Sequence, residues 1–199
     1  MSQKMGLRER KKISTRNAIL DGGLEVFSTL GYERSTITNI VAASGLSVGT
    51  FYNHFGDKKT VYAVLVNNML SQLREVLNET RNKAPTIEKF VMGAFFAYSD
   101  LMIENPKMQQ LIGKSTSVFR AFIAEEGGLV GIIEDLERDF HAAVNAGLSP
   151  KLPINLMTSV IIASSVELFT DEVDAKKSRE KAEFLGNLFL GGIHRLANS

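Results

Sequence analysis

Residues 45–58 read GLSVGTFYNHFGDK, and this short stretch concentrates hydroxyl, amide and imidazole groups. Thr50, Tyr52, Asn53 and His54 lie between two glycines, which leaves too few residues for a long helix. Such groups can form hydrogen bonds with phosphate oxygens or with the edges of nucleic-acid bases. Contact with a nucleic acid would explain why so many polar and aromatic side chains share one segment.

Two short helices joined by a tight turn are expected around this stretch. Residues 36–44 and residues 47–55 form the two helices, and Gly45-Leu46 separates them. Two helices around a turn that contains glycine make a helix-turn-helix, whose second helix enters the major groove of DNA. Phe51 and Phe55 lie four residues apart and can pack inward together.

The remaining positions of the second helix are available to DNA. Gly49 costs about 1 kcal/mol relative to alanine in a helix, so we expect it to permit a close approach of the backbone to DNA. The residues of this segment that we expect at the DNA are Ser47, Val48, Gly49, Thr50, Tyr52, Asn53 and His54.

Lys58 and Lys59 fall in the first turn of the next expected helix, which Asp57 would cap. A cation is unfavourable there because the helix dipole makes the amino end positive. A phosphate held by the free backbone N–H groups and by the ammonium would resolve the conflict. Simple exposure of both lysines to solvent is the alternative.

Charge is distributed unevenly along the 199 residues. The net charge is only +1, but residues 1–60 contain nine Lys and Arg against five Asp and Glu, a net charge of +4, and the rest carries −3. A basic N-terminal third predicts a polyanionic partner for that part alone. A solvated basic face is the alternative.

The sequence contains no cysteine, so disulfides and thiolate metal sites are excluded. Its first residues lack the apolar segment of a secretory signal. The uncharged apolar stretch at residues 152–166 is shorter than the roughly 20 apolar residues that cross a membrane. We therefore expect a cytoplasmic protein that has no membrane segment and needs no cofactor.

Apolar residues recur at three- and four-residue spacing along nearly the whole chain, whereas alternating strand patterns are missing. Glycine and proline interrupt this helical pattern at intervals. The predicted fold is all-α, with about nine helices at residues 8–31, 36–44, 47–55, 57–82, 86–104, 107–124, 129–146, 153–171 and 176–197.

Residues 35–62, STITNIVAASGLSVGTFYNHFGDKKTVY, closely resemble the DNA-binding domain of TetR-family transcriptional regulators. The resemblance is strong over residues 10–65. The residues that match the family pattern are Thr36, Ile40, Ala43, Gly45, Ser47, Gly49, Thr50, Tyr52, His54, Phe55 and Lys58. The resemblance implies an N-terminal three-helix helix-turn-helix DNA-binding domain at residues 1–60 and a C-terminal helical ligand-binding and dimerisation domain at residues 61–199.

By position, the resemblance also implies roles for individual side chains. The residues expected at phosphates are Thr36, Tyr52, His54 and Lys58, with Thr50 at a phosphate or a base. Thr38 and Val48 occupy positions that read bases in the family, where arginine, lysine or another polar residue is common. Bidentate reading of guanine is impossible from these two side chains, although Val48 could contact a thymine methyl. Basic residues between Arg8 and Arg16 could compensate through phosphate or minor-groove contacts.

The last two expected helices are suited to an interface between two copies of the chain. Residues 153–169 and 184–193 are apolar or small on nearly every side, and Gly186, Gly191 and Gly192 permit close approach of helices. Two such helices from each copy would form a four-helix bundle, and its two-fold symmetry would relate two recognition helices. Burial within a single chain is the alternative.

Aromatic residues and methionines of the middle helices could line a cavity for an apolar ligand. The candidate lining residues and polar anchors are Phe95, Tyr98, Met102, Phe119, Phe122, His141 and Ser165, with Glu167 as a further anchor. An ordinary core is the alternative for each of them. If the cavity exists, we expect a hydrophobic or amphipathic effector, such as a lipid-like acid or an aromatic drug.

Together these expectations describe a repressor that a small effector releases from a palindromic operator, with helix 57–82 carrying the motion. A transcriptional activator, or a helical small-molecule-binding protein without this release mechanism, is the alternative. An enzyme is disfavoured because the three histidines are far apart in sequence and no H-E-x-x-H, phosphate-binding loop or dinucleotide-binding glycine pattern is present.

Overall fold

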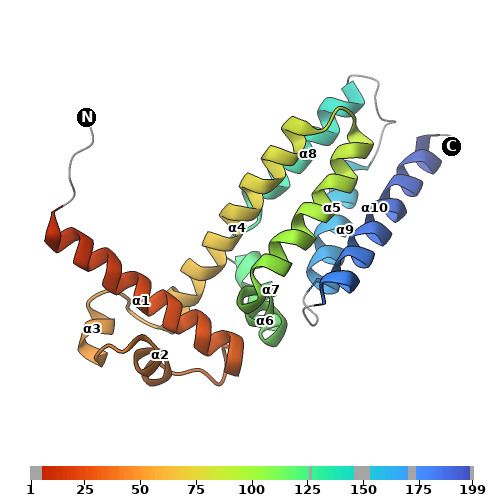
Figure 1. Ribbon diagram of the computed structural model, residues 1–199. Coiled ribbons are helices and arrows are strands. Elements are labelled where there is room, and N and C mark those ends of the chain that lie inside the picture. The colour runs from red at the N-terminus through yellow and green to blue at the C-terminus, as the bar shows by residue number, and fades with distance from the viewer. Residues whose placement is uncertain (1–5, 126, 146–152, 170–173, 198–199) are drawn as a thin grey trace.

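The computed structural model of this chain describes residues 6–125, 127–145, 153–169 and 174–197 (Figure 1). Within these ranges the protein is all-α, as the sequence predicts, and contains no strand. The helices are α1 (Leu7–Leu30), α2 (Ile37–Ser44), α3 (Val48–Tyr52), α4 (Lys58–Lys83), α5 (Ile87–Glu104), α6 (Pro106–Lys114), α7 (Thr116–Glu125), α8 (Val130–Asn145), α9 (Ile154–Leu168) and α10 (Ala175–Ala197).

The described ranges hold ten helices, because the single helix expected at residues 107–124 is divided into α6 and α7. Ser115 lies at the break with φ −135° and ψ 35°, outside the helical region. Its buried hydroxyl accepts a hydrogen bond of 2.8 Å from the backbone N–H of Tyr32, which belongs to a distant part of the chain. A tertiary contact therefore ends a helix that the apolar spacing would continue.

The first three helices form a lobe at one end of the molecule (Figure 1). Gly22 lets α1 and α2 approach closely, since a Cβ there would lie 2.9 Å from the Ile40 carbonyl oxygen and the Ser44 nitrogen. Gly45 closes α2 in the left-handed region at φ 67°, where glycine carries no steric cost. The expected turn between α2 and α3 is thus built on glycine.

Side-chain caps start the helices that follow. Thr36 and Asn39 form a reciprocal capping box at α2, Ser47 accepts from the Thr50 N–H at α3, and Asp57 accepts from the Thr60 N–H at α4. Each cap satisfies a backbone donor that the first turn leaves without a helical partner, which stabilises the helix by about 1 kcal/mol. The caps fix where the short helices begin.

The core of this lobe is aromatic. Phe51 and Phe55 are 0% and 3% exposed, and Phe27 is fully buried, so the inward packing predicted for the two phenylalanines of residues 47–55 is confirmed. Phe27 and Tyr62 meet edge to face with ring centroids 5.6 Å apart. Because Tyr62 belongs to α4, the aromatic core joins α4 to the first three helices.

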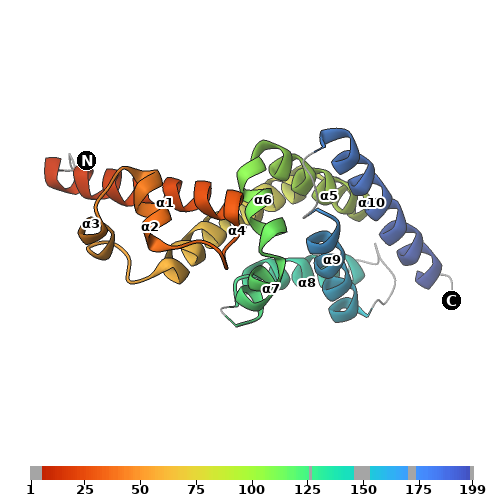
Figure 2. The ribbon, with the colours of Figure 1, turned by 90° about the horizontal axis from the view of Figure 1, so that it is seen from below.

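Helix α4 leaves this lobe and runs on without interruption into the rest of the molecule (Figure 1). The boundary predicted at residues 60 and 61 falls within its first turns. The second lobe contains α5 and α8 to α10 around the far part of α4, while α6 and α7 lie between the lobes (Figures 1 and 2). Among the described helices none is both long and apolar enough to span a membrane.

Packing in the second lobe is tight where α5 meets α10. Gly186 of α10 faces Met92 of α5, and a Cβ at this glycine would overlap the methionine sulfur. Ala182, Leu185 and Phe189 continue the buried face of α10. Gly186 therefore permits the close approach of α10 to α5 within the same chain. A Cβ at Gly191 or Gly192 would meet open space.

Two ion pairs connect α4 to α8. Arg74 donates to both carboxylate oxygens of Asp135, at 2.6 and 3.1 Å, and Arg138 reaches the same carboxylate at 2.6 Å. Two helical turns further along α4, Arg81 pairs with Asp139. The hydrogen bonds from Arg74 lower the pKa of Asp135 to about 2, whereas burial raises the pKa of Asp139 despite its partner.

Replacing Asp135 by Asn should lower the free energy of unfolding at neutral pH by about 1–2 kcal/mol. The full shift in pKa implies roughly 2.6 kcal/mol, and the half-exposed Arg74 reduces this through solvent screening. Because the folded pKa is depressed, the stabilisation is present above the unfolded pKa of about 3.9 and is lost as the pH falls toward the folded value.

Urea unfolding of wild type and Asp135→Asn between about pH 7 and about pH 3 measures this difference. The gap between the two proteins should shrink as the pH falls. Asp139→Asn is the control, since the raised pKa of Asp139 contributes no acid-sensitive stabilisation. A gap that stays constant across the range would contradict the role assigned to the Asp135 carboxylate.

Candidate functional site

Helix α3 presents an exposed face at the surface of the first lobe. Val48 and Tyr52 are 47% and 56% exposed, so this face presents an aliphatic and a phenolic side chain to solvent. Gly49 and Asn53 are also exposed, and Thr50 and His54 are half-buried. Thr36, the N-cap residue of α2, and Thr38 on α2 are exposed as well. Most of the predicted DNA-binding side chains thus share the surface around the helix-turn-helix.

The hydroxyl groups on this face differ in whether their hydrogen is already used in a hydrogen bond within the chain. Thr36 Oγ1 accepts from the Asn39 N–H and donates to Asn39 Oδ1 at 2.6 Å, so its proton is used inside the capping box. Ser47 Oγ and Thr50 Oγ1 lie 2.8 Å apart and share one proton, which leaves one hydroxyl hydrogen of the pair available. No hydrogen bond holds the Tyr52 hydroxyl within the described residues, and its ring rests edge to face on Phe51.

Lys58 has a structural role that the sequence pattern does not reveal. Its ammonium donates to the carbonyl oxygens of Tyr32 at 2.9 Å and Ser35 at 2.8 Å, with Glu33 at 3.5 Å, and lies 4.4 Å from the centre of the Tyr32 ring. An ammonium has three donors, and these carbonyls can take all of them. The lysine thereby fixes the turn between α1 and α2. A phosphate contact by Lys58 stays a prediction that would compete with these bonds.

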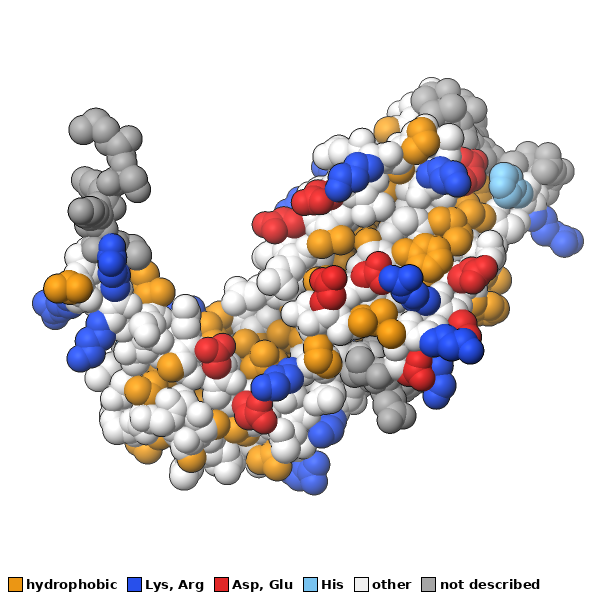
Figure 3. All heavy atoms as spheres, viewed as in Figure 1, with side chains coloured by type: hydrophobic (Ala, Val, Ile, Leu, Met, Phe, Trp, Pro, Cys, Tyr) orange, Lys and Arg blue, Asp and Glu red, His pale blue; other side chains and the backbone are white. Residues whose placement is uncertain are grey.

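A basic arm extends from this surface. The N-terminal turns of α1 protrude beyond α3 (Figures 1 and 2), and lysine and arginine side chains gather there in Figure 3. The exposed basic residues of this arm are Arg8, Arg10, Lys11 and Lys12. Arg16 is instead half-buried, with its guanidinium 4.9 Å from the centre of the Phe55 ring. Only the outer part of the predicted basic cluster is therefore free to meet a polyanion.

Two hydrogen bonds and a salt bridge connect this lobe to α6 and α7, and we call this set of contacts the Ser115 joint. The Tyr32 N–H donates to Ser115 Oγ at 2.8 Å, and the Lys114 ammonium donates to the Thr29 carbonyl oxygen at 2.9 Å. Lys107 and Glu25 form a salt bridge of 2.6 Å nearby. This joint was not predicted from the sequence, because serine and lysine on a predicted helix give no sign of a partner some 80 residues away.

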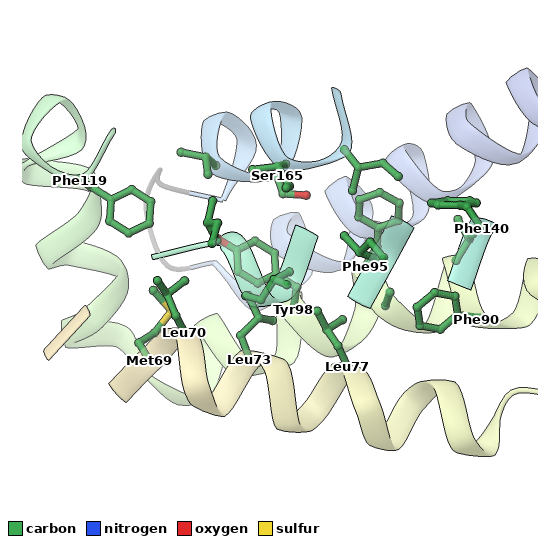
Figure 4. Close-up of a pocket in the computed structure, with 18 residues that line it drawn as sticks. Met69, Leu70, Leu73, Leu77, Phe90, Phe95, Tyr98, Phe119, Phe140 and Ser165 are labelled. Carbon is green, nitrogen blue, oxygen red and sulfur yellow. The ribbon is translucent and has the colours of Figure 1, made fainter. Parts of the chain in front are cut away.

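An apolar cavity of about 90 Å³ lies in the second lobe (Figure 4). Leu73 and Leu77 point into it from α4, and Ser165 faces it from α9. The lining residues are Met69, Leu70, Leu73, Leu77, Phe90, Val91, Ala94, Phe95, Tyr98, Phe119, Leu129, Ile132, Leu136, Phe140, Ile161, Ile162, Ser165 and Val166. The aliphatic contributions of α4 and α8 were missed, since a lining residue and a core residue have the same periodicity.

Four predicted ligand residues line this cavity: Phe95, Tyr98, Phe119 and Ser165. Three others do not: Met102 and Phe122 are buried elsewhere in the core, and His141 is exposed on α8. The helix phase explains His141, because Phe140 occupies the inward position and its neighbour must turn away. Glu167 follows Ser165 by two residues, so it lies on a different face of α9. Its carboxylate pairs with Arg120 at the surface.

Two hydroxyls give the cavity its polar character. Tyr98 and Ser165 are both lining residues, and neither hydroxyl has a hydrogen bond with the residues that the structure describes. Burial raises the pKa of Tyr98, so the phenol stays neutral and keeps its proton for donation. An apolar ligand with one or two acceptor atoms would fit this chemistry.

The last two helices leave apolar side chains uncovered. Leu156 and Val160 of α9 are 67% and 54% exposed, and Phe184 and Leu188 of α10 are 61% and 56% exposed. The spacing within each pair is four residues, so each helix carries one exposed apolar stripe. Burial of α9 and α10 within one chain is therefore incomplete.

Comparison with known proteins agrees with the geometry of the first lobe. Residues 19–65 match the family model of bacterial regulatory proteins, tetR family. The HTH-type transcriptional repressor AcnR of Corynebacterium glutamicum is 33% identical over 69 residues, which are 35% of this chain and 37% of AcnR. AcnR of Corynebacterium efficiens is 32% identical over the same length. The match thus spans little more than a third of these curated relatives.

Solved structures resemble the chain over both lobes. FadR, a fatty acid degradation regulator from Bacillus halodurans, has a TM-score of 0.77 at 20% identity, covering 96% of this chain and 98% of FadR. FadR from Bacillus subtilis, solved with stearoyl-CoA, has a TM-score of 0.72 at 19% identity, covering 85% and 96%. At such identities the similarity concerns the fold, which joins a helix-turn-helix lobe to a second helical lobe.

Replacing Lys58 by Met should lower the free energy of unfolding by about 1–3 kcal/mol. The variant keeps the aliphatic stem but leaves the carbonyl groups of Tyr32 and Ser35 without their shared donor. Chemical denaturation followed by circular dichroism measures the change. Lys59→Met, one position along the same turn and exposed, should stay within about 0.5 kcal/mol. Equal stability of the two variants would show that Lys58 does not hold the turn.

Proposed function

We propose that this chain, whose residues 19–65 match the model of the tetR family, is a transcriptional regulator of that family that binds a palindromic operator as a homodimer. In this proposal a hydrophobic or amphipathic effector binds in the second lobe and releases the operator. The exposed face of α3 is the observation that carries the proposal, because Val48 and Tyr52 have no use within the chain that would explain their exposure. The matching repressors of Corynebacterium support repression over activation.

The helix-turn-helix would place α3 in the major groove. Val48 offers an apolar contact for a thymine methyl, and Thr38 offers a hydroxyl that suits several bases. Neither can bind guanine through two parallel hydrogen bonds, so the bases at these positions are expected to be rich in A·T pairs. The basic arm from Arg8 to Lys12 would add phosphate contacts, which strengthen binding to any sequence and make it sensitive to salt.

A second copy of the chain would cover the exposed stripes of α9 and α10. Pairing of two helices from each copy forms a four-helix bundle with two-fold symmetry. The same symmetry would present two α3 helices to two half-sites separated by whole turns of DNA. Dimerisation therefore accounts both for the uncovered leucine and phenylalanine side chains and for a palindromic target.

The small size of the cavity favours an effector that acts by displacing helices. Its 90 Å³ lies well below the roughly 300–1,000 Å³ of sites that bury a drug-sized ligand. A ligand of that size can enter only if the surrounding helices separate. Helix α4 lines the cavity and begins in the DNA-binding lobe, and α7 lines it through Phe119 next to the Ser115 joint. Movement of either helix would reach the recognition surface.

Thermodynamic linkage limits what such an effector can do. It shifts the equilibrium only by its preference for the form whose α3 helices are wrongly spaced, and DNA must weaken effector binding by the same factor. FadR from Bacillus subtilis was solved with stearoyl-CoA, which joins a long acyl chain to a charged head, so a protein of this fold can hold an amphipathic molecule. That observation supports the effector class for this chain without fixing its identity.

Selection from a pool of random duplexes tests the DNA-binding part of the proposal. We expect a palindrome to be enriched, and we expect affinity to fall by more than about tenfold between about 50 and about 200 mM salt. Tyr52→Phe should weaken binding to that palindrome by about 3- to 10-fold, since it removes one hydroxyl that can reach a phosphate. Tyr62→Phe removes a buried hydroxyl instead and should leave DNA affinity unchanged. Failure to enrich any sequence would refute the proposed function.

The dimer is tested by the double variant Phe184→Glu and Leu188→Glu. Two charges per copy on the exposed stripe of α10 should raise the dimer dissociation constant more than about tenfold, as measured by sedimentation equilibrium. Val130→Glu is the control, because Val130 is 49% exposed but lies on α8, outside the two stripes. If both proteins stay dimeric like wild type, α10 is not part of the interface.

A further inference from the structure

A second depression, which we call the polar groove, lies among α7, α8 and α9, whose arrangement Figure 2 shows. Its volume is about 420 Å³. In contrast to the cavity, its lining includes charged and polar side chains, namely Arg120 of α7, Glu137 of α8, and Asn155 and Thr158 of α9, beside aliphatic ones such as Ile123 and Ile133. Neither the family match nor the similar structures assigns a role to it.

The polar groove and the apolar cavity share a wall. Ile162 and Val166 of α9 line both spaces, so these two aliphatic side chains form a partition between them. Both are only partly buried, and aliphatic side chains change rotamer without breaking hydrogen bonds. A molecule that enters the cavity between α8 and α9 would thus have its other end in the polar groove.

Thr158 places a hydroxyl beside the polar groove that the described part of the chain does not satisfy. The residue is 2% exposed, and its Oγ1 atom is buried without a hydrogen-bond partner among the described residues. A buried hydroxyl in this state destabilises a fold by about 1–3 kcal/mol, and valine would fill the same space without that cost. A ligand with a donor or acceptor at this position would supply the missing bond.

Charge decides which kind of head group the polar groove can hold. Arg120 is already paired with Glu167, whereas Glu137 forms no ion pair with the residues that the structure describes. The amino end of α9 carries a partial charge of about +0.5, which is smaller than the full negative charge of one carboxylate. The polar groove therefore has a net negative character, and an anionic head would have to approach Glu137 or displace Glu167.

We propose that the polar groove binds the ammonium head of an amphipathic amine whose apolar part occupies the cavity. Glu137 pairs with the ammonium, Thr158 Oγ1 accepts one of its N–H donors, and Phe119 and Phe140 surround the apolar part. This inference rests on the proposed function, in which the cavity is the effector site. It specifies the chemical class of the effector as a lipophilic cation.

The experiment compares three molecules that differ only in the head group: octylamine, octanol and octanoate. Isothermal titration calorimetry of the full-length protein, below the micellar concentration of each, should give one octylamine per protomer. We expect octylamine to bind at least about tenfold more tightly than octanol, and octanoate to bind most weakly. Octanoate binding as tightly as octylamine would overturn the proposal.

Substitutions at Glu137 and Thr158 test whether these side chains cause the preference for octylamine over octanol. Glu137→Gln should reduce octylamine affinity about tenfold and leave octanol affinity unchanged, whereas Glu134→Gln, on an exposed part of α8 away from the polar groove, should change neither. Thr158→Val should weaken octylamine binding while raising the melting temperature, because it removes an unpaired buried hydroxyl. Octylamine affinity that stays the same in Glu137→Gln would overturn the assignment of the head group to this carboxylate.

Failure of this inference can be told apart from failure of the proposed function. Affinity for the selected palindrome is measured with and without octylamine. If the palindrome binds but octylamine does not bind the protein, the amine site is refuted and DNA regulation stands. If octylamine binds at one site but leaves DNA affinity unchanged, the polar groove is a site, and the effector role of the cavity is refuted.

Discussion

Helix α4 imposes the constraint on which the rest of the structure depends, because one unbroken helix belongs to both lobes. Its first residue, Lys58, fixes the turn between α1 and α2 by donating to the carbonyl oxygens of Tyr32 and Ser35. Its later turns line the cavity through Leu73 and Leu77 and pair with α8 through Arg74 and Asp135. A rigid helix cannot change position at one end without changing it at the other.

A second connection runs through Ser115, and its physical character differs from that of α4. The hydroxyl accepts from the Tyr32 N–H, and the break that it creates separates α6 from α7. Tyr32 is also the residue whose carbonyl Lys58 binds. The same short turn is therefore held from α4 and from the α6–α7 junction. Two independent contacts on one turn make its position sensitive to any displacement of either support.

Polar groups in this molecule divide into those that the fold satisfies and those that it leaves over. Thr36 is satisfied by a helix cap, Asp135 by an ion pair, and Lys58 by hydrogen bonds to backbone carbonyl groups. The hydroxyl of Thr158 has no such use within the described residues, and Thr158 lines the polar groove, where a small molecule could reach the second lobe. Unsatisfied polar groups in apolar surroundings are costly, so their position beside cavities is informative about ligands.

The all-α class, the helix-turn-helix and the inward packing of Phe51 and Phe55 can be predicted from the sequence, because they follow from local spacing, caps and a glycine turn. The break at Ser115, the carbonyl contacts of Lys58 and the identity of the cavity-lining residues became visible only in the folded chain. Those outcomes depend on partners far away in the chain. Periodicity reports which face of a helix is buried, but it does not report which neighbour that face meets or whether a space remains between them.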